Sequence, residues 1–69
     1  MTLTPAYGRD YKSKKAVQTD WDNGKDFIIA DFMHPYSGKP FNKADLQREG
    51  IKTVMIRYNN LRSIQSFKV

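Results

Sequence analysis

The strongest constraint on the fold lies in the last third of the chain. Residues 51–58 and 61–69 are rich in β-branched and aromatic side chains, and the pair Asn59-Asn60 separates them. Asparagine tolerates the positive φ angles that tight hairpin turns require. The pattern therefore predicts a C-terminal β-hairpin.

The register of this hairpin depends on the length of its turn. A two-residue turn would pair Tyr58 with Leu61. Alternation along the first strand then places three side chains on the core face: Val54, Ile56 and Tyr58. On the second strand Ile64 has the opposite parity from Leu61 and Phe67, so we expect a bulge or a longer loop near Arg62.

A first helix is predicted from Ser13 to Asn23. Ser13 is a good N-cap, Val17 and Trp21 fall on one face at helical spacing, and Gly24 provides a stop. A start at Asp10, which is also an acceptable cap, is the alternative. We expect Trp21 to lie in the core, and anchoring of a partner protein is its other possible role.

A strand and a second helix complete the regular structure. Residues 25–31 contain a β-favouring run between polar residues, which predicts a short buried strand. Asn42 can cap a helix that extends through Glu49, with Leu46 facing inward and Gly50 ending it. The fold class is thus α+β, a small three-stranded, mostly antiparallel sheet that ends in the hairpin and carries one or two short helices on one face.

The domain organisation follows from the length and the N-terminal pattern. The 69 residues allow one domain with a thin core. Residues 1–8 show no periodicity and contain Pro5 and Gly8. Residues 1–12 are therefore expected to form a basic, aromatic arm, and residues 13–69 the single domain.

Composition excludes several classes of protein and of site. The chain has no cysteine and one histidine, so neither a disulfide framework nor the usual zinc cage can form. We predict no catalytic residue, no metal, no cofactor and no small-molecule substrate, and therefore no enzyme. The longest apolar run, at residues 27–30, is too short to span a membrane, and no signal peptide is visible, so a cytoplasmic location is expected.

Charge is segregated along the chain, whose net charge is +5. Residues 1–19 hold four cations and one acid, residues 20–31 hold four aspartates and one lysine, and residues 51–69 hold four cations and no acid. Such segregation can steer an anionic partner to one face of a protein. A fold that interleaves these blocks would instead cancel the field.

The basic N-terminal segment, YGRDYKSKK, is the leading candidate for contact with nucleic acid. Its cations can hold phosphates, and its tyrosines can stack on bases or can simply pack over the edge of the core. Lys14 and Lys15 also occupy the first turn of the predicted helix, where the macrodipole disfavours cations, so a bound phosphate would compensate. A solvated helix end with tolerable mismatches is the alternative. The predicted contact residues here are Arg9, Tyr11, Lys12, Lys14 and Lys15.

Two further surfaces are candidates for binding. The hairpin cations Arg57, Arg62 and Lys68 could line one exposed face of the sheet, as in sheet-based readers of nucleic acid. The segment from Phe32 to Phe41 is a long loop, and long loops in small domains are often functional. Its apolar residues could contact a host protein or a second copy of the chain, as could an exposed strand edge: Phe32, Met33, Tyr36 and Phe41.

Three stretches carry a resemblance to other proteins: the opening YGRDYKS, the middle D-W-x-x-G-K-D-F and the ending that contains I-R-Y. Together they resemble small uncharacterised proteins of bacteriophages and other mobile genetic elements. The resemblance implies a protein made in the cytoplasm of a host cell and no particular activity. The sequence thus favours a small, basic, non-enzymatic nucleic-acid-binding module, with a protein-interaction module as the alternative.

Overall fold

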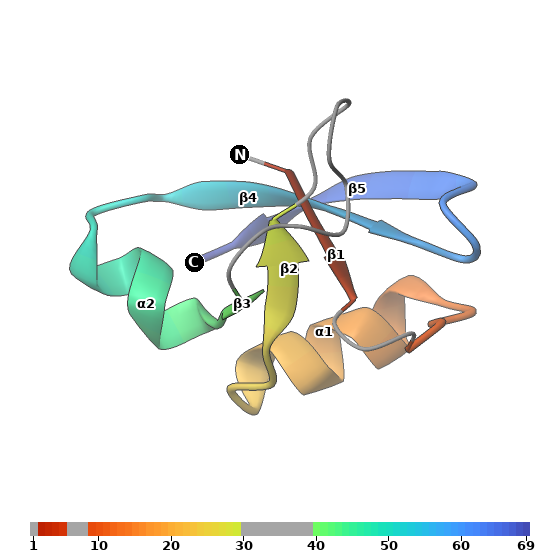
Figure 1. Ribbon diagram of the computed structural model, residues 1–69, viewed down its shortest axis with the longest axis horizontal. Helices are drawn as coiled ribbons and strands as arrows, with labels where there is room; N and C mark the ends of the chain where they lie inside the picture. Colours follow the sequence, from red (N-terminus) through yellow and green to blue (C-terminus); the bar gives the residue numbers. More distant parts are fainter. Residues whose placement is uncertain (1, 6–8, 30–39) are drawn as a thin grey trace.

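The C-terminal hairpin is present in the computed structural model, which describes residues 2–5, 9–29 and 40–69 (Figure 1). Strand β4 (Thr53–Tyr58) pairs antiparallel with strand β5 (Ser63–Lys68). Tyr58 lies opposite Ser63, so the predicted pairing of Tyr58 with Leu61 is wrong and the longer loop near Arg62 is confirmed. The loop is two residues longer than the predicted turn, and the side chains therefore keep the parity that the sequence indicates.

The turn between β4 and β5 has unusual backbone geometry. Asn59, Asn60 and Leu61 all have positive φ, at 56°, 53° and 65°, and Arg62 N donates to Asn59 O at 3.0 Å. The left-handed region suits asparagine, but it costs a side chain such as that of Leu61 roughly 1–2 kcal/mol. Contacts from outside the turn must offset this cost, and they are described below.

The sheet has five strands in the order β3-β2-β1-β4-β5, rather than the predicted three. The added strands are β1 (Thr2–Pro5) and β3 (Pro40–Phe41), and β2 (Phe27–Ile29) begins two residues later than predicted, while residues 30–31 of the predicted strand lie outside the described residues. β1 is antiparallel to β2 and parallel to β4, so the sheet is mixed. Four residues are too few to show an alternation in the sequence, which is why β1 was missed.

The position of β1 corrects the prediction of an N-terminal arm over residues 1–12. Thr2–Pro5 form the middle strand of the sheet, and Leu3 is completely buried between its neighbours. Thr4 is buried as well, and its Oγ1 donates to Ile28 O at 3.3 Å. Thr2–Pro5 are therefore part of the domain.

The two helices begin and end where local capping dictates. In α1 (Lys14–Asp22), Ser13 Oγ accepts a hydrogen bond from Ala16 N at 3.2 Å, which excludes the alternative start at Asp10. In α2 (Lys43–Arg48), Asn42 and Asp45 form a reciprocal capping box. Gly24 and Gly50 follow the helices with φ of 82° and 77°, which glycine adopts without a steric cost.

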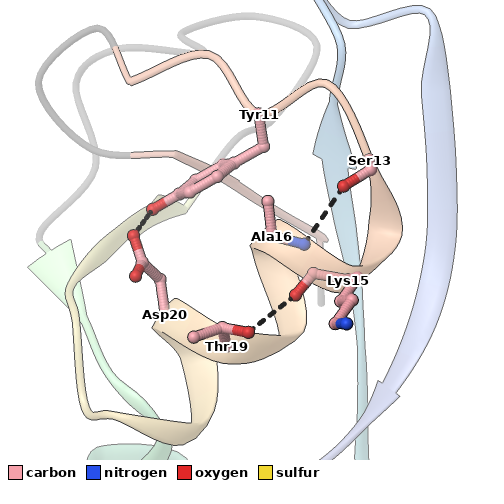
Figure 2. Close-up of a pocket in the computed structure, with 6 residues that line it drawn as sticks. All are labelled: Tyr11, Ser13, Lys15, Ala16, Thr19 and Asp20. Atoms are coloured by element: carbon pink, nitrogen blue, oxygen red, sulfur yellow. Dashed lines mark hydrogen bonds between the residues drawn. The ribbon is translucent and has the colours of Figure 1, made fainter.

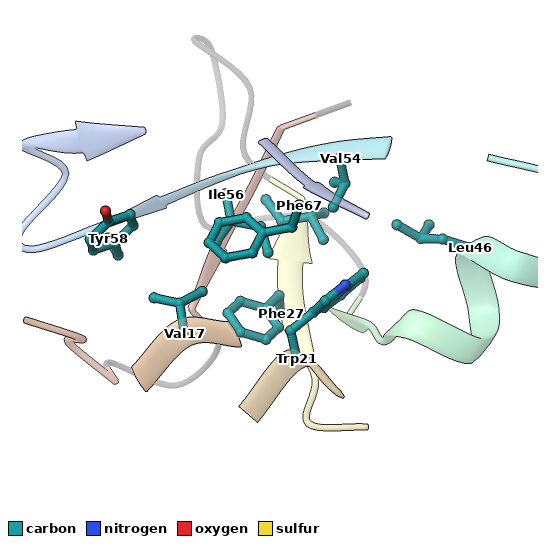
Figure 3. Close-up of a cluster of buried hydrophobic side chains, with 9 residues drawn as sticks. Val17, Trp21, Phe27, Leu46, Val54, Ile56, Tyr58 and Phe67 are labelled. Carbon is teal, nitrogen blue, oxygen red and sulfur yellow. The ribbon is translucent and has the colours of Figure 1, made fainter. Parts of the chain in front are cut away.

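The core lies between the helices and one face of the sheet (Figures 1 and 3). Trp21 is fully buried, as predicted. Its ring meets Phe27 edge to face at 5.5 Å, and its Nε1 donates to Lys68 O at 3.1 Å. The buried cluster comprises Leu3, Val17, Trp21, Phe27, Leu46, Val54, Ile56, Tyr58 and Phe67.

Candidate nucleic-acid interface

The segment that precedes α1 is fixed to the hairpin turn by two hydrogen bonds from backbone amides. Asn60 N donates to Asp10 Oδ1 and Asn59 N donates to Tyr11 O, each at 2.8 Å. These bonds satisfy donors on two of the three residues with positive φ. They therefore hold the turn in its strained conformation and place residues 9–12 beside it.

This docking gathers five cations at one end of the molecule, which we call the basic end. In Figure 1 the start of α1 and the tip of the β4–β5 hairpin lie on the same side of the fold. All five side chains belong to exposed residues. They are Arg9, Lys12, Lys14, Lys15 and Arg62.

Asp10 is the acid within this cluster, and it is engaged by its neighbours. Lys12 Nζ lies 2.7 Å from Asp10 Oδ2. The hydrogen bond from Lys12 holds the pKa of the Asp10 carboxyl below its ordinary value, with smaller effects in the same direction from the Asn60 N–H and the charge of Arg62. Asp10 thus offsets one of the five cations and leaves the cluster strongly positive.

The first turn of α1 adds donors to the cations. The N–H groups of Lys14 and Lys15 precede the first bonded amides of the helix. Ser13 Oγ serves as the cap acceptor, and its hydroxyl hydrogen remains available to donate. Lys14 Nζ lies 5.6 Å from the centroid of the Phe67 ring, and no carboxylate in the described ranges pairs with Lys15.

Tyr11, which the sequence offered as a base-stacking residue, is instead part of the packing. Its ring stacks on Phe27 with centroids 5.9 Å apart, and its hydroxyl donates to Asp20 Oδ2 at 2.5 Å. Burial, and then the hydrogen bond to Asp20, raise the pKa of the phenol. With one ring face covered and the hydroxyl bonded, Tyr11 positions the segment rather than a base.

A shallow depression beside α1 is shown in Figure 2. Its polar groups are bonded to one another: Tyr11 to Asp20, Ala16 N to Ser13 Oγ, and Thr19 Oγ1 to Lys15 O at 2.9 Å. In the three described ranges, no group of three or more His, Cys, Asp or Glu residues could hold a metal ion. The chemistry on offer here is the binding of anions by Lys15 and the helix start.

The hairpin cations do not all join the basic end. Arg62 lies in the turn, whereas Arg57 and Lys68 lie on the strands with the parity of Met55 and opposite to the buried Ile56. They therefore occupy the sheet face that points away from the helices, which we call the outer face. The predicted nucleic-acid set is thus divided between two surfaces.

The predicted apolar partner-binding loop receives little structural description. Phe32, Met33 and Tyr36 lie outside the described residues. Phe41 is in β3 opposite Phe27, is partly buried, and packs against the core cluster. Its position accounts for its apolar character without a partner.

The contact that sequence reasoning missed is the role of Asp10. The sequence marks it as a possible helix cap, but its carboxylate binds an amide fifty positions away. Nothing in the local pattern distinguishes these two uses, because a helix cap and a turn ligand both need a short side chain with an acceptor oxygen.

The fold and site define a small α+β domain with a five-stranded mixed sheet and a cation-rich end. Comparisons of this chain with protein-family models, curated proteins and solved structures find no match. Neither of the two helices described is long and apolar enough to cross a bilayer.

Proposed function

We propose that this protein is a non-enzymatic module that binds the phosphate backbone of nucleic acid through its basic end. The observation that carries the proposal is the docking of residues 9–12 on the hairpin turn by Asp10 and Tyr11. It unites cations from the two basic blocks of the sequence, residues 1–19 and 51–69, through a contact between residues fifty positions apart. Clustered cations beside amide donors at a helix start are well suited to phosphates.

The placement of aromatic rings favours phosphate contacts over base contacts. In the described part of the sheet, Phe27, Tyr58 and Phe67 are buried in the core, and Phe41 is paired with Phe27. Tyr11 is stacked on Phe27 as well. Single-strand binders that read bases present exposed rings. We therefore propose recognition with little sequence preference.

The resemblance to small proteins of bacteriophages and mobile elements is consistent with this proposal. Such proteins commonly bind nucleic acid or a host protein. On this basis the site of action is the cytoplasm of a host cell, and no cofactor or small-molecule substrate takes part.

The test is the salt dependence of binding to a labelled 20-base-pair DNA duplex, measured by fluorescence anisotropy. Lys12 is paired with Asp10, which leaves four cations: Arg9, Lys14, Lys15 and Arg62. Because each neutralised phosphate contributes about −0.9, the slope of log affinity against log salt should be about −3.6. Replacing both Lys14 and Lys15 by alanine should make the slope shallower by about 1.8.

The matched control is the double variant Lys25→Ala with Lys52→Ala. Both lysines are exposed, and they lie at the end of α1 and at the start of the hairpin, away from the basic end. The control removes the same charge and should leave the slope within about half a unit of the parent value. If the slope becomes shallower by the same amount in the two double variants, net charge alone governs binding, and the basic end is rejected as the site.

A further inference from the structure

Strand β5 forms one edge of the sheet, and its outward backbone groups follow from the register. Val69 N donates to Lys52 O at 3.0 Å, so the bonded pairs with β4 are at residues 54/67, 56/65 and 58/63. The N–H and C=O groups of Ile64, Ser66 and Lys68 therefore point away from β4. Of these, Lys68 O accepts from Trp21 Nε1.

The remaining outward groups have no partner among the residues that the structure describes. The Ile64 and Ser66 N–H groups face outward in a strand of six residues without proline or bulge. Edge strands that are protected from pairing usually carry such interruptions. The β5 edge thus has room for an added strand, and its backbone groups select an extended peptide as the occupant.

Charge beside the edge selects the kind of peptide. Lys14 lies on the helix side of β5, over Phe67, and Lys68 lies on the outer face. Arg62 stands at the turn, and residues 51–69 contain no acid. Because side chains of an added strand alternate between the two faces, acidic residues on either face would meet a cation.

Exposed apolar side chains accompany these cations. Ile64 on the outer face is 42% exposed, and Leu61 in the turn is 47% exposed. A peptide that alternates acidic and β-branched residues could place its carboxylates on the helix side, near Lys14, and cover Ile64 on the outer face.

We propose that β5 binds an acidic, extended segment of a partner protein as a sixth strand of the sheet. This occupant is favoured over a second copy of the chain, because antiparallel self-pairing of Ile64 with Ser66 would place Arg62 of one copy opposite Lys68 of the other. This inference does not rest on nucleic-acid binding, because the edge consists of the β5 backbone, although Lys14 and Arg62 belong to both surfaces.

The test uses a capped eight-residue peptide of alternating glutamate and valine, titrated into the full chain and followed by NMR with hydrogen exchange. The Ile64 and Ser66 amides should exchange more slowly by at least about tenfold, as expected for newly bonded amides. The Gln65 and Phe67 amides, already bonded to β4, should change much less. A lysine-valine peptide should bind at least about tenfold more weakly, a difference of about 1.4 kcal/mol.

One substitution then removes a donor from the edge itself. Ser66→Pro deletes an outward N–H without removing a bond to β4, and Ser66→Thr is its matched control. Proline should lower peptide affinity by about tenfold or more, and threonine should not. If the proline variant does not fold, the same peptide with N-methyl groups on alternate residues makes the test on the parent protein.

Each result decides for or against the proposal. Binding that persists with the N-methylated peptide, or that leaves the Ile64 and Ser66 amides unprotected, would reject strand addition. Protection of these amides in the free protein that increases with concentration would show that a second copy occupies the edge and would also overturn the proposal.

Discussion

The two ends of helix α1 carry charges of opposite sign, and the structure treats them differently. At the C-terminal end, Asp20 accepts a hydrogen bond from Tyr11, and Asp22 accepts hydrogen bonds from Lys43 at 3.0 Å and Gln18 at 3.0 Å. At the N-terminal end, Lys15 has no carboxylate partner in the described ranges. The charges at both ends are unfavourable in the field of the helix macrodipole. In the described ranges, only the charges at the acidic end are offset by hydrogen bonds and an ion pair with neighbouring side chains.

The charges at the C-terminal end of α1 thus have a structural role, whereas those at its N-terminal end have no carboxylate partner in the described ranges. The bond from Lys43, which outweighs that from Gln18, keeps the pKa of Asp22 low and links the end of α1 to α2. Among the residues that the structure describes, the lysines at the start of α1 have no such ion pair, and Lys14 contacts the Phe67 ring. An anionic partner would provide the missing compensation, which is why the proposed interface lies there.

The largest expected effect on stability comes from Trp21, the buried residue near the acidic, C-terminal end of α1. Trp21→Ala removes a fully buried ring and a hydrogen bond to β5, and it should cost about 3–5 kcal/mol of unfolding free energy. A chain of this size has only about 3–10 kcal/mol in total, so the variant should lose a large share of its stability. Urea denaturation followed by circular dichroism measures this. A loss below about 1 kcal/mol would show that this end is not structural.

A smaller effect of opposite sign distinguishes the two ends directly. Lys14→Ala with Lys15→Ala should stabilise the protein by roughly 0.3–1 kcal/mol per charge removed, because the macrodipole no longer opposes them. Asp20→Ala relieves the dipole in the same way, but it should destabilise by about 1 kcal/mol because the partly buried Tyr11 hydroxyl loses its acceptor. Equilibrium unfolding of both variants gives the comparison. Stabilisation by both would mean that the contact between Tyr11 and Asp20 has no structural value.

The smallest expected effect occurs only at acidic pH. It concerns the hydrogen bond from the Asn60 amide to the Asp10 carboxylate, which helps to hold residues 9–12 beside the hairpin turn. Because the folded-state pKa of Asp10 is lowered, its contribution is complete above the ordinary value of 3.8 and is lost as the pH falls through the lowered value. Exchange of the Asn60 amide should accelerate over that range. Asp10→Asn has no charge to titrate, so its Asn60 amide should show no such acceleration. If exchange of the Asn60 amide accelerates over the same pH range in both proteins, the acceleration comes from other carboxyl groups and not from Asp10.

Much of the secondary structure could be predicted because its signals are local. Ser13 and Asn42 as caps, Gly24 and Gly50 as stops, and the inward face of β4 all depend on residues within a few positions of one another. The length of the hairpin turn was harder to predict, because Leu61 adopts a conformation that its own side chain disfavours.

Only part of the candidate site could be predicted from such local signals. Its cations are visible as a cluster in the N-terminal sequence, but Tyr11 was grouped with them because an aromatic ring near lysines does not reveal what it packs against. The joining of Arg62 to the cluster and the separation of Arg57 and Lys68 from it both depend on the sheet register.

The α+β class, the capped helices, the hairpin and the segregation of charge could all be derived from the sequence, because they follow from local propensity and composition. Tertiary structure alone decided that Thr2–Pro5 form the middle strand and that Asp10 binds Asn60. Pairings between segments fifty residues apart depend on backbone hydrogen bonds and shared burial, which leave little mark on so short a strand or on a single carboxylate.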